Sequence, residues 1–301
     1  MNNARTSEII SKIQSLLKEL QQIVDQPQAV LTALAEDLSG FESLRKALQS
    51  DRWPEAVNPM LICDPNSEKD KVERGRGIVE LMIEEDLNGL KFLDFGCGEG
   101  HCVNMSSEQN TIISVGYDIK QYESWERLKE NKENLLFTTN IDEVASKGPY
   151  DVIILFDVID HLASEEKPIT VLSKARSLLS DKGKVYMRCH PFTSRHATHL
   201  YHTLNKAYVH LVFNPGELKE IIPDCPYVEP SIGVTTPIKT YQDFIEKAGL
   251  KIDSRRDITE KVEPFFKIPV IAERIMRNTK SNQFPEFQMS VQFIDYVLKK
   301  K

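Results

Sequence analysis

Short apolar runs alternate with stretches of helical periodicity from Leu90 to the end of the chain. Five of these runs predict β-strands, at residues 91–95, 112–117, 135–138, 152–156 and 184–189. Residues 249–253, after a helical stretch at 241–248, and residues 289–298 are candidates for two further strands. Strands separated by helices are typical of a parallel, doubly wound α/β sheet. Ligands of such sheets bind outside the carboxyl ends of the strands, so we expect the functional side chains there.

The first 50 residues have a different pattern, with apolar side chains at steps of three and four that Pro27 interrupts. They predict two amphipathic helices, which could form a homo-oligomer, cover an active site, or pack on their own domain. Prolines at residues 51–67 indicate a linker, and residues 68–85 predict a helix. The expected organisation is a helical appendage (1–50), a linker (51–67) and a sheet domain (68–301) with an inserted substrate region at about 190–240.

Composition narrows the class of protein. The 301 residues are 41% hydrophobic and 28% charged, which suits a globular core. A net charge of −7 argues against non-specific binding to nucleic acid, and no apolar run approaches the ~18 residues of a membrane span. The N-terminus lacks the apolar stretch of a secretory signal, and the five cysteines are scattered, so we expect a cytoplasmic protein without a membrane partner.

A glycine-rich segment follows the first predicted strand. Asp94 stands two residues before Gly96, and Gly98 and Gly100 come next; the second strand ends at Asp118. Alternating glycines allow the backbone to approach a ligand closely, and an acid closing the next strand can meet ribose hydroxyls. The spacing G-x-G-x-G differs from the G-x-G-x-x-G of dinucleotide folds, and this favours S-adenosylmethionine over NAD.

These two segments resemble the first two motifs of class I S-adenosylmethionine-dependent methyltransferases. The resemblance implies a seven-stranded Rossmann-like sheet with S-adenosylmethionine as cofactor. It also implies that Asn140 and Ile141, just past the third strand, lie beside the adenine; a strand-ending Asn next to a core Ile is an equally good account. The cofactor-binding residues that we expect are Asp94, Gly96, Cys97, Gly98, Gly100, Asp118, Ile119, Asn140, Ile141 and Asp157.

The turn after the fourth strand carries Asp157, Asp160 and His161 in a D-x-x-D-H pattern. It resembles the E-x-x-E-H turn of metal-assisted O-methyltransferases of ubiquinone biosynthesis and of small-RNA 3′ ends. The resemblance implies a divalent cation (Mg²⁺, Mn²⁺ or Zn²⁺) on Asp157, Asp160, His161 and His210, although aspartate in place of glutamate shortens each arm. The alternative is a metal-free site in which Asp157 contacts the methionine amino group and His161 is a general base.

Six of the seven histidines lie between residues 161 and 210. His196, His199 and His202 recur every three residues, which predicts one face of a helix after the fifth strand. We expect His190 to be catalytic together with His161 and Asp157, and Arg188, Arg195, His196 and His199 to bind substrate, the arginines gripping a phosphate or carboxylate. Individual histidines could instead satisfy hydrogen bonds in the core or be solvated. Residues 223–237 are a candidate substrate lid.

The expected function is O-methylation of a small molecule or of a terminal nucleotide, with or without a metal. Two alternatives remain open. One is an N-methyltransferase that acts on a protein or nucleic-acid base without metal. The other is an inactive cofactor-binding scaffold whose N-terminal helices recruit a partner.

Overall fold

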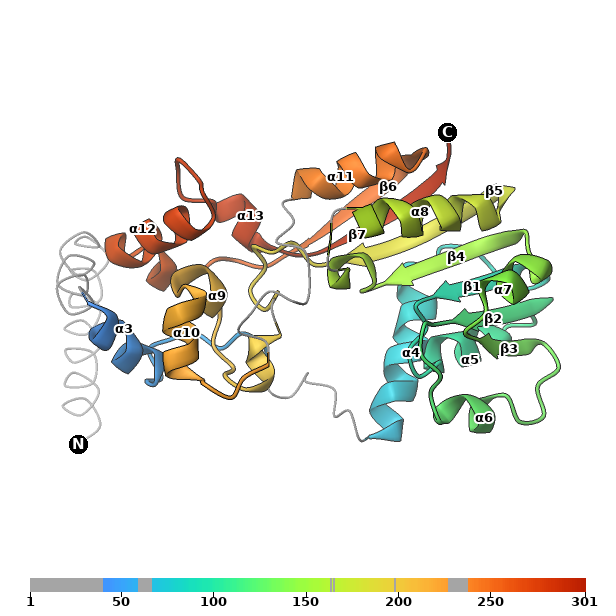
Figure 1. Cartoon of the computed structure of the whole chain (residues 1–301), viewed down its shortest axis with the longest axis horizontal. Coiled ribbons are helices and arrows are strands. Elements are labelled where there is room, and N and C mark those ends of the chain that lie inside the picture. Colours follow the sequence, from blue (N-terminus) through green and yellow to red (C-terminus); the bar gives the residue numbers. More distant parts are fainter. Residues whose placement is uncertain (1–39, 59–66, 163, 165, 198, 227–237) are drawn as a thin grey trace, which may run out of the picture.

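The computed structural model describes residues 40–58, 67–162, 164, 166–197, 199–226 and 238–301. Figure 1 shows two parts: a twisted sheet with its helices, and a group of short helices beyond one end of the sheet. The two N-terminal amphipathic helices lie outside the described residues except for the last part of the second. The candidate lid also lies outside them, apart from residues 223–226.

One sheet of seven strands confirms the predicted fold. Its order is β3-β2-β1-β4-β5-β7-β6, and β7 runs antiparallel to both β5 and β6. The other neighbouring pairs are parallel. The strands are β1 (Lys91–Phe95), β2 (Ile113–Tyr117), β3 (Leu135–Thr138), β4 (Tyr150–Phe156), β5 (Leu179–Cys189), β6 (Leu250–Thr259) and β7 (Val291–Lys300).

Helices bury both faces of this sheet, which explains why the inner strands are apolar along their length. On one face Leu93 packs in a core with side chains of α7, α8 and α11. On the other face Phe92 packs with side chains of α4 and α5. The helices of this half are α4 (Glu68–Met82), α5 (His101–Ser107), α6 (Ser124–Leu128), α7 (Ile141–Lys147), α8 (Glu166–Leu178) and α11 (Ile238–Lys247).

A second core holds the short helices together, and we call this part the helical lobe. Three separate chain segments form it: residues 41–53, 200–225 and 262–289. Trp53 stacks on Phe213 with ring centroids 5.7 Å apart, and its indole N–H donates to the Ala207 carbonyl at 2.9 Å. Its helices are α3 (Phe41–Leu48), η3 (Leu200–His202), α9 (Val209–Val212), α10 (Pro215–Ile221), η4 (Pro264–Lys267), α12 (Pro269–Asn278) and α13 (Glu286–Ser290).

The described residues of the predicted appendage and linker contribute to the lobe. The described end of the predicted appendage, α3, packs in the same core as residues from the middle and the end of the chain. Trp53, which falls in the predicted linker, is buried there.

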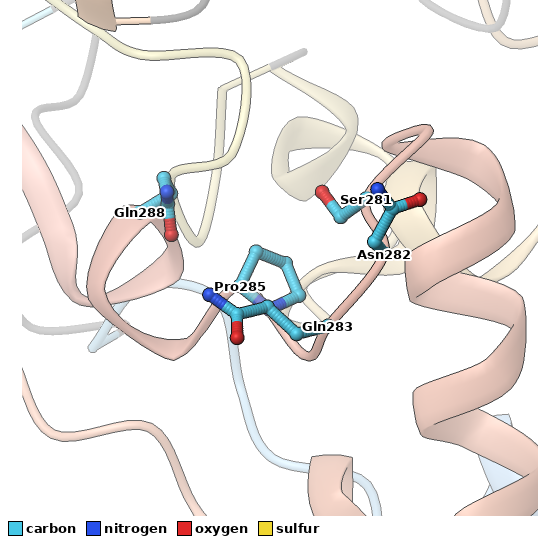
Figure 2. Close-up of a pocket in the computed structure, with 5 residues that line it drawn as sticks. All are labelled: Ser281, Asn282, Gln283, Pro285 and Gln288. Carbon is cyan, nitrogen blue, oxygen red and sulfur yellow. The ribbon is translucent and has the colours of Figure 1, made fainter.

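A pocket lies between α12 and α13 (Figure 2), lined by Ser281, Asn282, Gln283, Pro285 and Gln288. Within the described ranges, no helix combines the length and the apolar character that crossing a membrane requires.

Candidate functional site

The turn after β1 has the backbone conformation that its glycines predict. Gly96, Gly98 and Gly100 have φ angles of 108°, 50° and 87°. A Cβ added to Gly100 would lie 2.4 Å from the Phe137 ring, so both conformation and space require glycine there. The amide of Gly98 donates to the Asp118 carboxylate at 2.9 Å, which ties the turn to the end of β2.

Asp94 lies beneath this turn and is almost completely buried. Burial raises the pKa of Asp94 to about 7, and the nearby Asp118 carboxylate contributes in the same direction. Two acids and a glycine turn therefore meet at the carboxyl ends of β1 and β2, where the sequence predicts the cofactor.

The remaining expected cofactor residues lie beside this corner. The Asn140 side chain caps α7, accepting a hydrogen bond from the Asp142 amide at 2.9 Å. Ile141 packs partly buried against the core of the sheet, and Ile119 is 88% exposed. Asn140 and Ile141 thus also have the structural roles that the sequence left open as their alternative.

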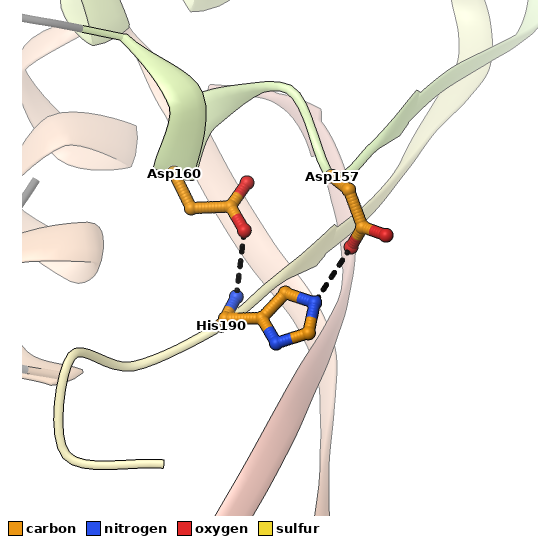
Figure 3. A group of neighbouring side chains, drawn as sticks. All are labelled: Asp157, Asp160 and His190. Atoms are coloured by element: carbon orange, nitrogen blue, oxygen red, sulfur yellow. Dashed lines mark hydrogen bonds and ion pairs between the residues drawn. The ribbon is translucent and has the colours of Figure 1, made fainter. Parts of the chain in front are cut away.

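Three side chains meet where β4 and β5 end (Figure 3). Asp157 follows β4 with φ 54°, a left-handed conformation that aspartate tolerates better than most residues, and its amide donates to the Arg188 carbonyl at 3.1 Å. Its Oδ1 lies 3.3 Å from Nε2 of His190, the residue after β5. Asp160, in the short helix η2 (Ile159–His161), accepts a hydrogen bond from the His190 amide at 3.2 Å.

Electrostatic attraction between Asp157 and His190 determines the direction in which their pKa values shift. Burial lowers the pKa of His190, but the Asp157 carboxylate outweighs burial and the net pKa is raised. Burial likewise raises the pKa of Asp157, but His190 outweighs it and the net pKa is lowered. Burial, with the Asp157 charge, raises the pKa of Asp160 to about 6. Asp157 and His190 therefore each stabilise the charged form of the other, and we call them the Asp157–His190 pair.

The same three residues could hold a cation. One ligand atom from each of Asp157, Asp160 and His190 lies within 4.8 Å of the other two, and no other such group occurs in the described part of the chain. His161 and His210, expected as ligands, are not among them. His161 is exposed, and Nε2 of His210 lies 2.8 Å from the Phe192 carbonyl oxygen.

The histidines after β5 gather without the helix that the sequence predicts. The described residues from 191 to 206 form turns and the single turn η3, and His199 has φ 57°. The rings of His161 and His199 nevertheless stack at 5.2 Å, and His190 meets His196 at 5.3 Å. Burial lowers the pKa of His196 to about 3 and that of His199 to about 4. The imidazoles of His196 and His199 are therefore neutral at physiological pH.

Comparison with known proteins shows the family to which the chain belongs. The family described as "Methyltransferase domain" matches residues 66–223, more than half of the chain. The chain belongs to this methyltransferase family. It is a methyl-transferring enzyme, and S-adenosylmethionine is the methyl donor that its glycine turn and acids fit.

Solved methyltransferases resemble the enzyme distantly. One from Archaeoglobus fulgidus is 20% identical, covers 76% of this chain and 94% of its own, and superposes with a TM-score of 0.46. One from Mesorhizobium loti is 11% identical, covers 76% of this chain and 100% of its own, with a TM-score of 0.47. A comparison with curated proteins gave no significant match.

The two arginines expected to grip an anionic substrate already have carboxylate partners in the methyltransferase. Arg188 binds Asp295 through two nitrogens, at 2.6 and 2.8 Å. Arg195 lies 2.5 Å from Glu263 and donates to the Glu55 carbonyl. The structure therefore does not bring them together as an anion site. His196 and His199 lie beside His190, as expected for residues near the substrate.

Sequence reasoning missed Asp295. It lies in β7, opposite Arg188 in the strand register, and its side chain is 11% exposed. The sequence indicated this residue only as the one acid within the mostly apolar run Val291–Leu298. Arg74 of α4 completes the site, because it lies 3.4 Å from the second oxygen of Asp157.

Proposed function

We propose that this methyltransferase methylates a hydroxyl group, on a small molecule or a terminal nucleotide, and that His190 accepts the proton of that hydroxyl. The observation that carries the proposal is the Asp157–His190 pair at the carboxyl ends of β4 and β5, in which His190 is buried and Asp157 is partly buried. Asp157 approaches Nε2, while the other ring nitrogen, Nδ1, is buried without a hydrogen-bond partner among the described residues.

This arrangement suits a proton acceptor. Asp157 holds the ring with Nε2–H toward the carboxylate, so that Nδ1 is the basic nitrogen. Proton transfer to Nδ1 creates an imidazolium, which the buried carboxylate stabilises. The fixed charges need no reorganisation during the reaction, and burial strengthens their attraction.

The reaction follows from the donor's chemistry. The acceptor oxygen forms a bond to the sulfonium methyl carbon, the carbon–sulfur bond breaks, and S-adenosylhomocysteine leaves as a neutral thioether. The proton of the hydroxyl passes to His190. The enzyme's main contribution is to align the two reactants, with the glycine turn, Asp94 and Asp118 holding the donor.

A divalent cation is a second means of activating the same hydroxyl. Asp157, Asp160 and His190 fit such an ion, because each offers it a buried atom that accepts no hydrogen bond from the described residues: Oδ1 of each aspartate and Nδ1 of the histidine. These three residues would hold it, and the ion would lower the pKa of the acceptor hydroxyl. His210, the ligand that the resemblance implies, would then act elsewhere.

The test is methyl transfer by the full chain, measured as S-adenosylhomocysteine released with a panel of hydroxyl and amine acceptors. We expect turnover with hydroxyls, and His190→Gln to lower kcat by about 10²- to 10⁴-fold, the usual contribution of a general base. Asp157→Asn should lower it as well, while Asp181→Asn, at a fully exposed aspartate, should not. Calorimetry with S-adenosylhomocysteine checks that each variant still binds cofactor product.

Three results would change the proposed function or the role proposed for His190. Turnover with amines alone would favour the N-methyltransferase alternative. Full activity of His190→Gln would remove the proposed base. Loss of activity on exhaustive chelation, restored by Mg²⁺, Mn²⁺ or Zn²⁺, would assign the cluster to a metal, and an effect of His210→Asn on metal content would then favour the expected ligand set.

A further inference from the structure

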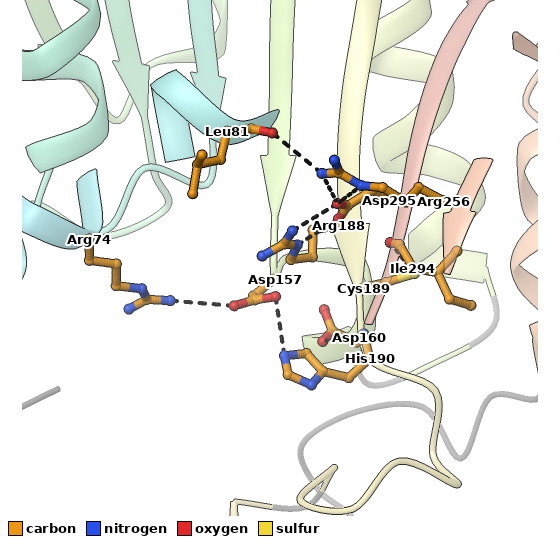
Figure 4. A network of polar contacts seen from close by, with 10 residues as sticks. All are labelled: Arg74, Leu81, Asp157, Asp160, Arg188, Cys189, His190, Arg256, Ile294 and Asp295. Atoms are coloured by element: carbon orange, nitrogen blue, oxygen red, sulfur yellow. Dashed lines mark hydrogen bonds and ion pairs between the residues drawn. The ribbon is translucent and has the colours of Figure 1, made fainter. Parts of the chain in front are cut away.

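Four charged and aromatic residues form a row across the sheet, next to the Asp157–His190 pair: Phe156 directly precedes Asp157, and Arg188 stands two residues before His190. Phe156 of β4 is paired in register with Arg188 of β5, Arg188 with Asp295 of β7, and Asp295 with Arg256 of β6. Partners in register lie side by side on the same face of the sheet. Figure 4 shows the polar members of this row next to Asp157 and His190.

Asp295 is the centre of the row. Its two oxygens bind Nε and one terminal nitrogen of Arg188 at 2.6 and 2.8 Å, and Arg256 donates to one of them at 2.8 Å from the opposite side. The Arg188 guanidinium also lies 5.3 Å from the centre of the Phe156 ring and 5.1 Å from that of Phe293. Arg188 is therefore held by a fork of hydrogen bonds between two aromatic rings.

Arg188 would otherwise compete for the Asp157 carboxylate. Asp157 directly follows Phe156, the register partner of Arg188, and its amide already bonds to the Arg188 carbonyl. Neighbouring strands are about 4.8 Å apart, well within the reach of an arginine side chain. A mostly buried guanidinium without Asp295 needs another anion, because an unpaired buried charge is costly.

The aromatic ring of Phe293 couples the same arginine to His190. The His190 ring packs on Phe293 with centroids 4.4 Å apart, and Phe293 is the ring that Arg188 covers. Movement of the guanidinium toward Asp157 would therefore disturb both partners of the pair at once.

We infer that Asp295 is a positioning residue for methyl transfer: it holds Arg188 away from Asp157, so that the Asp157 carboxylate stays paired with His190. This inference rests on the proposed function, in which that pairing prepares the proton acceptor. Asp295 itself touches neither His190 nor Asp157 through any described hydrogen bond.

The experiment detects the contact between the His190 N–H and the Asp157 carboxylate directly and at one fixed pH. An imidazole N–H held by a carboxylate gives a proton NMR signal at low field, well separated from the amide signals. We would record it on the chelated full chain with S-adenosylhomocysteine bound, and assign it by its loss in His190→Gln.

We expect Asp295→Asn to abolish this signal and Arg256→Gln to keep it, since Arg256→Gln leaves the Arg188–Asp295 fork intact. The double variant Asp295→Asn with Arg188→Gln should regain the signal, because the competing charge is gone. A merely structural role of Asp295 would not give this recovery. An unchanged signal in Asp295→Asn, or no recovery in the double variant, would overturn the inference.

Failure of this inference is distinguishable from failure of the proposed function. If His190→Gln keeps full methyl transfer while Asp295→Asn still loses the signal, the positioning role stands and the proton acceptor is another group. If the wild-type chain has no low-field signal, Asp157 does not hold the His190 N–H and the inference falls, whatever the activity.

Discussion

Replacing Asp94 with asparagine should make the cofactor-free enzyme more stable, and increasingly so as the pH rises. Asp94 is buried under the glycine turn beside Asp118, and burial with that second charge raises its pKa from 3.8 to about 7. A carboxyl whose pKa is raised by folding favours the folded state while it is protonated. That contribution is fully present below pH 3.8 and is lost as the pH rises through about 7.

The size of the effect follows from the same two values. At about 1.4 kcal/mol per pKa unit, the interval between 3.8 and about 7 corresponds to about 4 kcal/mol. The asparagine side chain carries no charge at any pH. The free energy of unfolding of Asp94→Asn should therefore equal that of the wild type near pH 4 and exceed it by up to about 4 kcal/mol at pH 8.

Urea unfolding of both proteins without cofactor, at intervals between pH 4 and 8, measures this difference. Asp181→Asn is the matched control, because its carboxylate is fully exposed and its effect should stay within about 0.5 kcal/mol at every pH. A difference between wild type and Asp94→Asn that does not change with pH would refute the reasoning. We also expect Asp94→Asn to bind S-adenosylhomocysteine more weakly, so that stability and cofactor affinity move in opposite directions.

Two further substitutions test the turn and the lobe, and a third, in α4, is the control for the turn. Gly100→Ala combines a left-handed backbone with a Cβ 2.4 Å from the Phe137 ring, so it should lower the free energy of unfolding by about 2–4 kcal/mol and weaken S-adenosylhomocysteine binding in calorimetry. Gly77→Ala in α4, where a Cβ meets nothing within 4 Å, should instead stabilise by up to about 1 kcal/mol; equal effects of the two would contradict this account. Trp53→Ala removes a buried ring stacked on Phe213 and should lower the free energy of unfolding by about 3–5 kcal/mol. The affinity for S-adenosylhomocysteine should stay unchanged. A loss of that affinity would show that the lobe also contributes to cofactor binding.

The sequence predicts the sheet well because each strand carries its own local signal. Lys91–Phe95 and Leu135–Thr138 begin and end where the apolar runs do. β5 begins five residues earlier than predicted, at Leu179, because Ser180, Asp181 and Lys182 are polar and hide the strand. Their conformation depends on the neighbouring β4, where Tyr150 pairs with Leu179, and not on their own side chains.

The helical lobe could not be predicted in the same way. Its core joins Leu48, Phe213 and Ile275, which are far apart in the sequence, and no local pattern reports such contacts. The spacing of His196, His199 and His202 was misleading for a related reason: the segment is folded by its surroundings, with His199 in a left-handed conformation that a helix excludes.

The sequence predicted the acids of one turn and also His190 as a residue that acts with Asp157, but it did not predict which side chains of other strands contact them. Asp157 and Asp160 share one turn with His161, so the pattern predicted the two acids as a group. Their histidine partner is His190, which the register of β4 and β5 places beside them, whereas His210 bonds to a backbone carbonyl. Asp295 enters the site only through the antiparallel pairing of β5 with β7.

The glycine turn and the helical lobe come from different parts of the sequence, and this affects how such an enzyme can evolve. The glycine turn and both of its acids lie in one continuous stretch, from Asp94 to Asp118, whereas the lobe is assembled from three segments that are far apart in the sequence. Mutations in the lobe can accumulate without altering the donor-binding turn. The glycine turn and its two acids can thus be inherited unchanged while the other end of the molecule is rebuilt.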